Sequence, residues 1–189
     1  MDTTVVTPAT DVAARASTAL RHLYLARFTF AAVWAVLLFT SARTLGPLSV
    51  TLLLVYPLFD VGCAVIDART TKPNGGPARA LYANIALSTL AAAGLAAAAS
   101  SGIPAVLRVW GLWAITAGLV QLIVGILRRG MTGQWPMIVS GALSTLAGGS
   151  FIAQAGKGDA SLSALAGYGL LGGIFFLLSA FRLRRTTTR

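Results

Sequence analysis

The residues of this chain that could do chemistry are polar side chains inside otherwise apolar stretches. The sharpest is Asp60, six residues before the end of an apolar run that closes at Ile66. In a helix six residues span about 9 Å, so such a run would carry the carboxylate well below a membrane surface. An ionisable group at that depth is costly unless it is paired, and it marks a functional site by default.

Three further polar residues are expected at a similar depth. Arg27 lies three residues into the first apolar run, Asn84 four residues into the third, and Gln121 six residues before the end of the fourth. We therefore predict one polar cluster in the cytoplasmic half of the membrane, made of Arg27, Asp60, Asn84 and Gln121.

This cluster allows two interpretations. It is an interhelical clamp if Asp60 pairs with Arg27 and the amides add hydrogen bonds that fix helix packing. It handles a proton or a substrate if burial favours the protonated carboxyl more strongly than Arg27 favours the charged one. Pro57, one turn before Asp60, removes a helical hydrogen bond, and it either curves the helix or opens a pocket beside the carboxylate.

Other kinds of chemistry find little support. The chain has no glutamate, one cysteine (Cys63) and one histidine (His22), so no metal-ligand group and no base for a serine nucleophile can be assembled. Residues 167–172 spell GxGxxG, but they lie in an apolar run with no preceding strand, so dinucleotide binding is not expected. We expect a protein that is not an enzyme and that carries no metal and no cofactor.

Six apolar runs must position these residues. Each is about 20 residues long, the length of helix that crosses a bilayer. Charged residues make up only 11% of the chain, against about 25% in soluble domains, and the runs lack the alternation of barrel strands. The predicted fold is an all-α, six-helix polytopic membrane bundle with spans at Tyr24–Ala42, Leu48–Ile66, Ala80–Ala99, Ala105–Leu127, Trp135–Ala153 and Ser161–Phe181.

The cations sort unevenly between the two sides of this bundle. The net charge is +10, but no nucleic-acid motif accompanies it. With a cytoplasmic N-terminus, twelve of the fifteen lysines and arginines fall on the cytoplasmic side and three fall outside. This bias predicts a multi-pass membrane protein with both termini cytoplasmic. Its expected partners are anionic lipid head groups and a second copy or another membrane protein, and no nucleic acid.

The predicted organisation has three parts. Residues 1–23 form a cytoplasmic N-terminal tail, residues 24–185 the six-helix membrane domain, and residues 186–189 a cytoplasmic tail. Helical spacing of apolar residues in the N-terminal tail indicates either an interfacial helix or an extension of the first span.

Small and aromatic residues add expectations about packing. Gly169 and Gly173 form a small-xxx-small surface on the sixth span, and Ser144 and Gly148 do the same on the fifth. The tryptophans fit an aromatic belt at the membrane surfaces better than a ligand cage, with Trp110 expected at the outer surface.

An internal repeat relates the spans. The hexapeptide ALSTLA occurs at 86–91 and at 142–147, an offset of 56 residues that also relates Gly111 to Gly167 and the Arg pair at 128–129 to that at 184–185. The third and fourth spans are thus duplicated as the fifth and sixth, and the first two fall in register as a third unit with little identity. Each unit runs in–out–in, so the hairpins are parallel repeats about an axis along the membrane normal.

These features carry a resemblance. Trp135–Pro136 opens the fifth span, YPLFD at 56–60 is followed by Asp67–Arg69, and the glycine-rich sixth span runs into Arg182–Arg185. Over roughly residues 25–185 the chain resembles the HdeD-like family of small bacterial inner-membrane proteins, an acid-resistance membrane protein family. The resemblance implies six short helices in repeated hairpins and an association with stress or acid tolerance, without a catalytic set.

The functional hypotheses follow from these observations. The first is a non-enzymatic inner-membrane protein of stress or envelope physiology that acts through helix packing or partner contacts. The alternative is a small transporter or channel with Asp60 near its substrate or proton site, and a third is an assembly subunit for another membrane protein. Transport requires a water-accessible polar cavity that reaches Asp60, whereas a clamp requires a dry bundle with the carboxylate paired.

Overall fold

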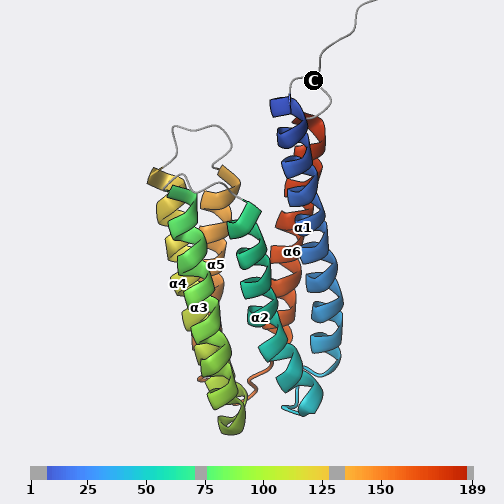
Figure 1. The fold of residues 1–189 in the computed structure, drawn as a ribbon. Coiled ribbons are helices and arrows are strands. Elements are labelled where there is room, and N and C mark those ends of the chain that lie inside the picture. The colour runs from blue at the N-terminus through green and yellow to red at the C-terminus, as the bar shows by residue number, and fades with distance from the viewer. Residues whose placement is uncertain (1–7, 71–75, 128–134, 187–189) are drawn as a thin grey trace, which may run out of the picture.

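The computed structural model describes residues 8–70, 76–127 and 135–186, and these residues are helical apart from short turns (Figure 1). They confirm the predicted all-α fold of six long helices. A short 3₁₀ turn, η1 (Ala99–Ser101), precedes the fourth helix. The long helices are α1 (Pro8–Thr40), α2 (Pro47–Thr70), α3 (Gly76–Ala98), α4 (Ile103–Leu127), α5 (Trp135–Gln154) and α6 (Ser163–Thr186).

Proline marks where most of these helices begin. It occupies the first or second residue of five of the six, where its missing N–H has no helical acceptor and its fixed φ favours the first turn. The five positions are Pro8, Pro47, Pro77, Pro104 and Pro136. Between Pro8 and Thr40 no further proline or glycine intervenes, so α1 is one continuous helix and residues 8–23 extend the first span.

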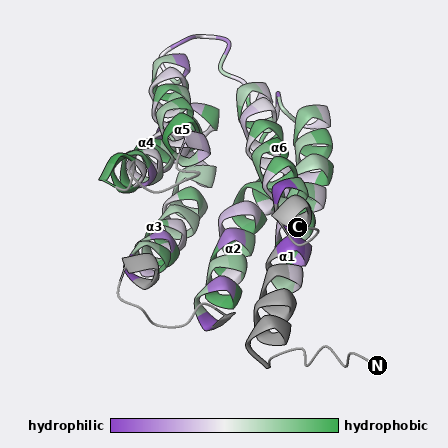
Figure 2. Cartoon of the chain, turned by 90° about the horizontal axis from the view of Figure 1, so that it is seen from above, coloured by the Kyte–Doolittle hydropathy of each residue, from purple (hydrophilic) through white to green (hydrophobic). Residues whose placement is uncertain are grey.

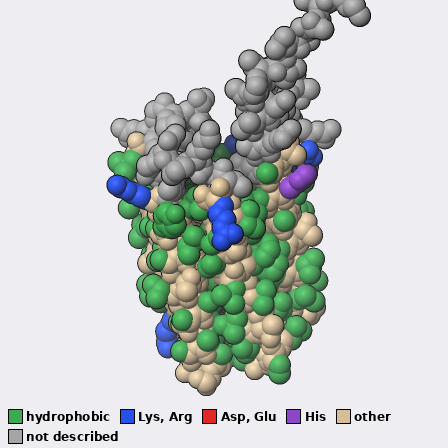
Figure 3. All heavy atoms as spheres, in the orientation of Figure 1, with side chains coloured by type: hydrophobic (Ala, Val, Ile, Leu, Met, Phe, Trp, Pro, Cys, Tyr) green, Lys and Arg blue, Asp and Glu red, His purple; other side chains and the backbone are tan. Residues whose placement is uncertain are grey.

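The outer surface of the bundle is apolar. Each long helix contains a stretch of 20 to 25 residues that is long and apolar enough to cross a membrane. Large side chains along them face outward, among them Leu90, Leu127 and Leu146 with exposed fractions of 69%, 79% and 71%. Figure 3 shows such side chains over the middle of one face, with lysine and arginine mainly toward the upper end. Because lipid is the solvent such a surface requires, the chain is an integral, multi-pass membrane protein.

The helices form a ring in chain order. Each helix contacts the next, and α6 closes the ring on α1, as the view along the bundle shows (Figure 2). The most extensive contacts are α4 with α5, α1 with α6, and α2 with α3, whereas the two helices of each hairpin (α1/α2, α3/α4, α5/α6) touch less. Three hairpins therefore pack against one another around a common centre. The start of α1 and the end of α6 lie at the same end (Figure 1), as six crossings require.

Aromatic side chains fill the centre of this ring. Trp34 of α1 stacks on Trp110 of α4 with ring centroids 5.5 Å apart. Tyr56 of α2 lies 4.4 Å from Trp34 and 6.3 Å from Trp113, again between centroids. The Trp34 indole N–H also donates to the carbonyl oxygen of Leu52 at 2.7 Å. We call Trp34, Tyr56, Trp110 and Trp113 the aromatic hub, and it joins three helices that are not all neighbours in the ring.

The hub corrects the expected position of Trp110. This residue was predicted at the outer membrane surface, but its side chain is fully buried. It lies seven residues into α4, about 10 Å along the helix, and it faces inward with Val106 and Ala114. Trp135 is the first residue of α5 and is 74% exposed. It therefore lies at one end of the bundle, where a residue of an aromatic belt is expected.

Candidate functional site

The polar residues of α1, α2 and α3 meet in the half of the bundle where α1 begins. Asp60 lies in the second half of α2, whose neighbours in the ring are α1 and α3. Because adjacent helices run antiparallel, a residue late in α2 lies level with residues early in α3. Asn84 and Ser88 are four residues apart on α3 and therefore share one face, and this is the face that α2 covers.

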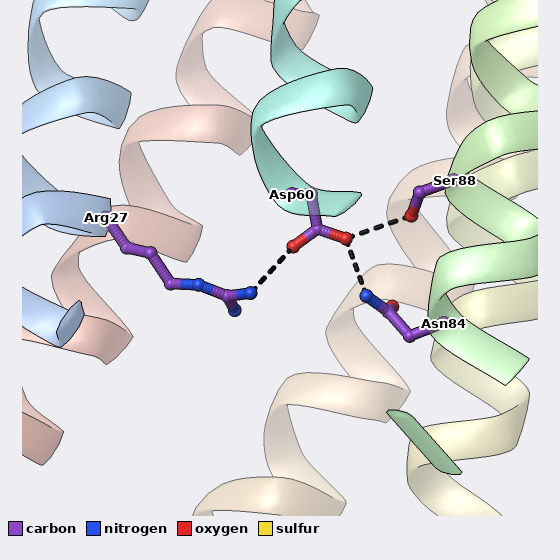
Figure 4. Close-up of polar contacts among 4 residues, drawn as sticks. All are labelled: Arg27, Asp60, Asn84 and Ser88. Atoms are coloured by element: carbon purple, nitrogen blue, oxygen red, sulfur yellow. Dashed lines mark hydrogen bonds and ion pairs between the residues drawn. The ribbon is translucent and has the colours of Figure 1, made fainter. Parts of the chain in front are cut away.

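The Asp60 carboxylate is engaged on both oxygens (Figure 4). Its Oδ1 lies 3.2 Å from Nη2 of Arg27 on α1. Its Oδ2 accepts hydrogen bonds from Asn84 Nδ2 at 2.7 Å and from Ser88 Oγ at 2.9 Å. One carboxylate thus ties α2 to α1 through charge and to α3 through two neutral donors. We call Arg27, Asp60, Asn84 and Ser88 the polar clamp.

The surroundings of Arg27 complete the electrostatics of the clamp. The Arg27 and Asp60 side chains are 15% and 22% exposed, and Ser88 is fully buried. The guanidinium carbon lies 4.7 Å from the ring centroid of Phe176 on α6, a distance at which a cation is attracted to an aromatic face. Arg27 Nε is buried, with no hydrogen-bond partner among the described residues. The Arg27–Asp60 pair has no net charge. The Phe176 ring stabilises the positive charge of Arg27, and Asn84 and Ser88 stabilise the negative charge of Asp60.

Three of the four predicted cluster residues come together, and Gln121 does not. Gln121 is half-buried on α4, and the donors to Asp60 come from α1 and α3 instead. Counting residues along the helix predicted Gln121 at the level of Asp60, but no hydrogen bond or ion pair joins Gln121 to Asp60 among the described residues. Ser88 takes its place. The available signal was the four-residue spacing from Asn84, within a hexapeptide that we interpreted only as a repeat.

Pro57 lies in α2 between Tyr56 of the aromatic hub and Asp60 of the polar clamp. Tyr56 precedes Asp60 by four residues, so the hydroxyphenyl ring and the carboxylate occupy one face of α2. Pro57 lies inside α2 and is buried, and α2 continues through it to Thr70. Within the hub, Nε1 of Trp110 and Nε1 of Trp113 are buried without a hydrogen-bond partner among the described residues. The hub therefore packs chiefly through its rings, whereas the clamp packs through polar atoms.

The predicted packing residues lie at helix contacts, but they contact different neighbours. A Cβ added to Gly148 would lie 2.5 Å from the carbonyl oxygen of Gly111 on α4. One added to Gly169 would lie 2.6 Å from the Trp34 ring, and one added to Gly173 would lie 2.9 Å from Cβ of Ala31. The nearest atom is a backbone oxygen at Gly148 and a side-chain atom at Gly169 and Gly173, and a Cβ would be crowded at all three positions. Ser144 instead faces α6, where its Oγ accepts a hydrogen bond from the Tyr168 hydroxyl at 3.0 Å.

The chemistry available in this arrangement is limited. Among the described residues no group of three or more His, Cys, Asp or Glu side chains could hold a metal ion. Cys63 is buried on α2, one turn beyond Asp60. Asp60 is the acidic residue of the clamp, and Arg27, Asn84 and Ser88 contact its two carboxylate oxygens. The loop cations Lys72, Arg128 and Arg129, which entered the prediction of topology, lie outside the described residues.

Comparison with known proteins gives no relative. No family model, no curated protein and no solved structure matches the chain. The function therefore has to be argued from the polar clamp, the hub and the apolar surface.

Proposed function

We propose that this protein is a non-enzymatic protein of the bacterial inner membrane that acts through its packed helices and their contacts with partners in the bilayer. The observation that carries the proposal is the engagement of both Asp60 oxygens by α1 and α3. A carboxylate held by one cation and two neutral donors has its acceptor sites occupied by the protein itself. That is the arrangement of an interhelical clamp.

The physiological part of the proposal rests on the sequence resemblance. The resemblance to the HdeD-like family supports a role in stress or acid tolerance of the cell envelope, and the uneven distribution of lysine and arginine supports cytoplasmic termini. The structure is compatible with that role, since six apolar helices and an internally paired carboxylate need no substrate. A membrane protein whose large apolar side chains face outward along every helix also has ample surface for a partner helix.

A strain that lacks the gene tests this role. We expect reduced survival at low pH and recovery when the wild-type gene is returned. The Asp60→Asn gene should restore survival in proportion to the amount of folded protein in the membrane, because an amide oxygen still accepts from Asn84 and Ser88. A strain without any survival defect would refute the stress role. A folded Asp60→Asn protein that is present at wild-type amount and fails to restore survival would refute the clamp.

The second candidate is a small transporter or channel, and one observation favours it. Arg27 Nε is buried without a partner among the described residues, and the Arg27 and Asp60 side chains keep 15% and 22% of their surface exposed. An anion or a water chain reaching the guanidinium from the end where α1 begins would satisfy that donor. This reading requires water at Asp60, and access of a water-soluble reagent to α2 separates it from the clamp.

A further inference from the structure

A groove lies between α5 and α6, in the half of the bundle where α5 ends and α6 begins. Its volume is about 440 Å³, and most of its lining is apolar. Phe151 and Tyr168 meet edge to face in it with ring centroids 5.6 Å apart. The Tyr168 hydroxyl is already bonded to Ser144. A ligand in the groove would therefore contact mainly apolar surface and would find few hydrogen-bond partners.

The internal repeat gives this groove an equivalent elsewhere. The buried residues Ala35 and Leu38 of α1 and Ala42 of the following turn recur as the buried residues Gly148 and Phe151 of α5 and Ala155 of the following turn, 113 positions later. On α2 and α6, buried Leu53 and Pro57 recur as buried Leu165 and Gly169, 112 positions later. Both shifts are close to twice the 56-residue offset of the sequence repeat. The contact between α5 and α6 thus corresponds to the contact between α1 and α2.

Ring side chains fill the contact between α1 and α2. Trp34 lies against Tyr56 with centroids 4.4 Å apart, and its N–H donates to Leu52. Phe30 stacks on Phe59 with centroids 3.8 Å apart. Aromatic rings in contact have centroids no more than about 7 Å apart. The rings of α1 and α2 are therefore in contact and leave no groove between these two helices.

Smaller residues occupy the corresponding positions in the groove. Ala147 corresponds to Trp34, Leu143 to Phe30 and Leu171 to Phe59. Ala164 corresponds to Leu52 and Gly167 to Val55, and a Cβ added to Gly167 would meet no atom within 4 Å. The groove is therefore the space that an indole and larger side chains occupy in the first hairpin.

We propose that this groove binds one acyl chain of a phospholipid. Both α5 and α6 are spans, so hydrocarbon surrounds the groove. Water has too few polar partners there, and an empty groove would forfeit dispersion contacts along its walls. Leu146, which is 71% exposed, lines the groove, and a flexible acyl chain can bend to pass beside it. Lys157 and Asp159 are both exposed in the turn between α5 and α6, so the chain and not the head-group charge is recognised.

Photolabelling tests this site directly. The full-length protein is reconstituted in phosphatidylcholine bilayers that contain a small share of phosphatidylcholine with a diazirine in one acyl chain, and labelled residues are mapped after irradiation. We expect label to concentrate on the groove residues of α5 and α6 over equally exposed faces of α3. Gly167→Leu fills open space and should reduce groove labelling several-fold, and so should Ala147→Trp, which restores the ring present at position 34.

Gly149→Leu is the matched control. Gly149 is an exposed glycine of α5 that does not line the groove, and its added Cβ also meets nothing within 4 Å. This variant should keep the wild-type labelling pattern. Two results would overturn the proposal. One is label spread evenly around the bundle and unchanged in Gly167→Leu. The other is a groove that takes up no label while the exposed faces of α3 are labelled.

Discussion

The contacts of α2 with α3 and of α4 with α5 are equivalent, because each joins one repeat hairpin to the next, yet they are built differently. Asn84 and Ser88 of α3 correspond to Ser140 and Ser144 of α5 at the 56-residue offset. On α3 these positions donate to the carboxylate of Asp60. On α5 the contact with α4 passes through glycines instead. A Cβ on Gly118 would lie 2.8 Å from the carbonyl oxygen of Gly141.

The difference shows two ways of holding helices together where lipid removes the hydrophobic driving force. Glycines at 111, 118 and 125 of α4 recur every seven residues, and Gly141 and Gly148 of α5 keep the same spacing. They let two backbones approach along a whole face. The polar clamp instead concentrates its bonds at one carboxylate. A glycine contact fails through steric clash, whereas a clamp fails through an uncompensated charge.

The largest expected effect comes from adding volume to the glycine contact. In Gly141→Val, Cβ would lie 2.6 Å from the Leu122 nitrogen and 2.7 Å from the Gly118 carbonyl oxygen. Backbone atoms cannot move aside as a flexible side chain can, so we expect a loss of about 3 kcal/mol or more. Reversible unfolding in detergent measures it. Gly149→Val on the same helix, with no atom within 4 Å of its Cβ, should stay near wild type.

Breaking the charge pair is expected to be nearly as harmful. Arg27→Met leaves the Asp60 carboxylate without its cation and should destabilise by about 3 kcal/mol, the lower end for a buried pair, because both side chains are partly exposed. The double variant Arg27→Met/Asp60→Asn removes both charges and keeps an amide oxygen for Asn84 and Ser88. It should be more stable than Arg27→Met alone in the same unfolding assay. A double variant that is less stable would show that the pair is not the source of the effect.

Single hydroxyls should matter less, and the repeat supplies a matched pair. Ser88 is fully buried and donates to a charged acceptor, so Ser88→Ala should cost about 1–2 kcal/mol. Ser144 occupies the same repeat position but is half-buried and bonded to the neutral Tyr168 hydroxyl. Ser144→Ala should cost about 0.5 kcal/mol. Equal losses for both serines would mean that the carboxylate adds nothing to the bond.

The smallest contrast lies within the aromatic hub. Trp34→Phe removes the bond to the Leu52 carbonyl, whereas Trp110→Phe removes an N–H that has no partner among the described residues. Both changes lose similar ring area, so Trp34→Phe should be the more destabilising by about 1 kcal/mol. Thermal unfolding of the two purified variants compares them. A larger loss for Trp110→Phe would indicate that its indole N–H has an acceptor, such as a bound water.

Much of the fold could be predicted from the sequence because lipid permits few solutions. Continuous apolar runs of about 20 residues gave six spans whose ends agree with most helix ends to within a few residues. The N-terminus of α1 was less predictable, because no breaker separates residues 8–23 from the span and both alternatives satisfied the pattern. Burial of Trp110 also escaped prediction, since a tryptophan near a span end fits an aromatic belt and a core equally well.

The polar clamp could be predicted only in part. Depth along a helix follows from counting residues, and it brought Arg27, Asp60 and Asn84 to one level. Counting does not show which side chains face one another, and for that reason Gln121 was included and Ser88 missed. The four-residue spacing from Asn84 was a signal for Ser88, but its meaning depends on the facing side chain, Asp60.

Access of water to α2 tests the central claim, that Asp60 is a clamp within a dry bundle, most directly. Cys63, the chain's sole cysteine, is 4% exposed and lies one turn from Asp60. A membrane-impermeant maleimide should leave Cys63 of the folded protein unlabelled both in right-side-out vesicles and in inverted vesicles. The two kinds of vesicle expose opposite faces of the membrane to the reagent. The same reagent should label Gly158→Cys in a Cys63→Ala background, since Gly158 lies exposed in a turn. Rapid labelling of Cys63 in folded protein would contradict the clamp and favour a water-filled path to Asp60.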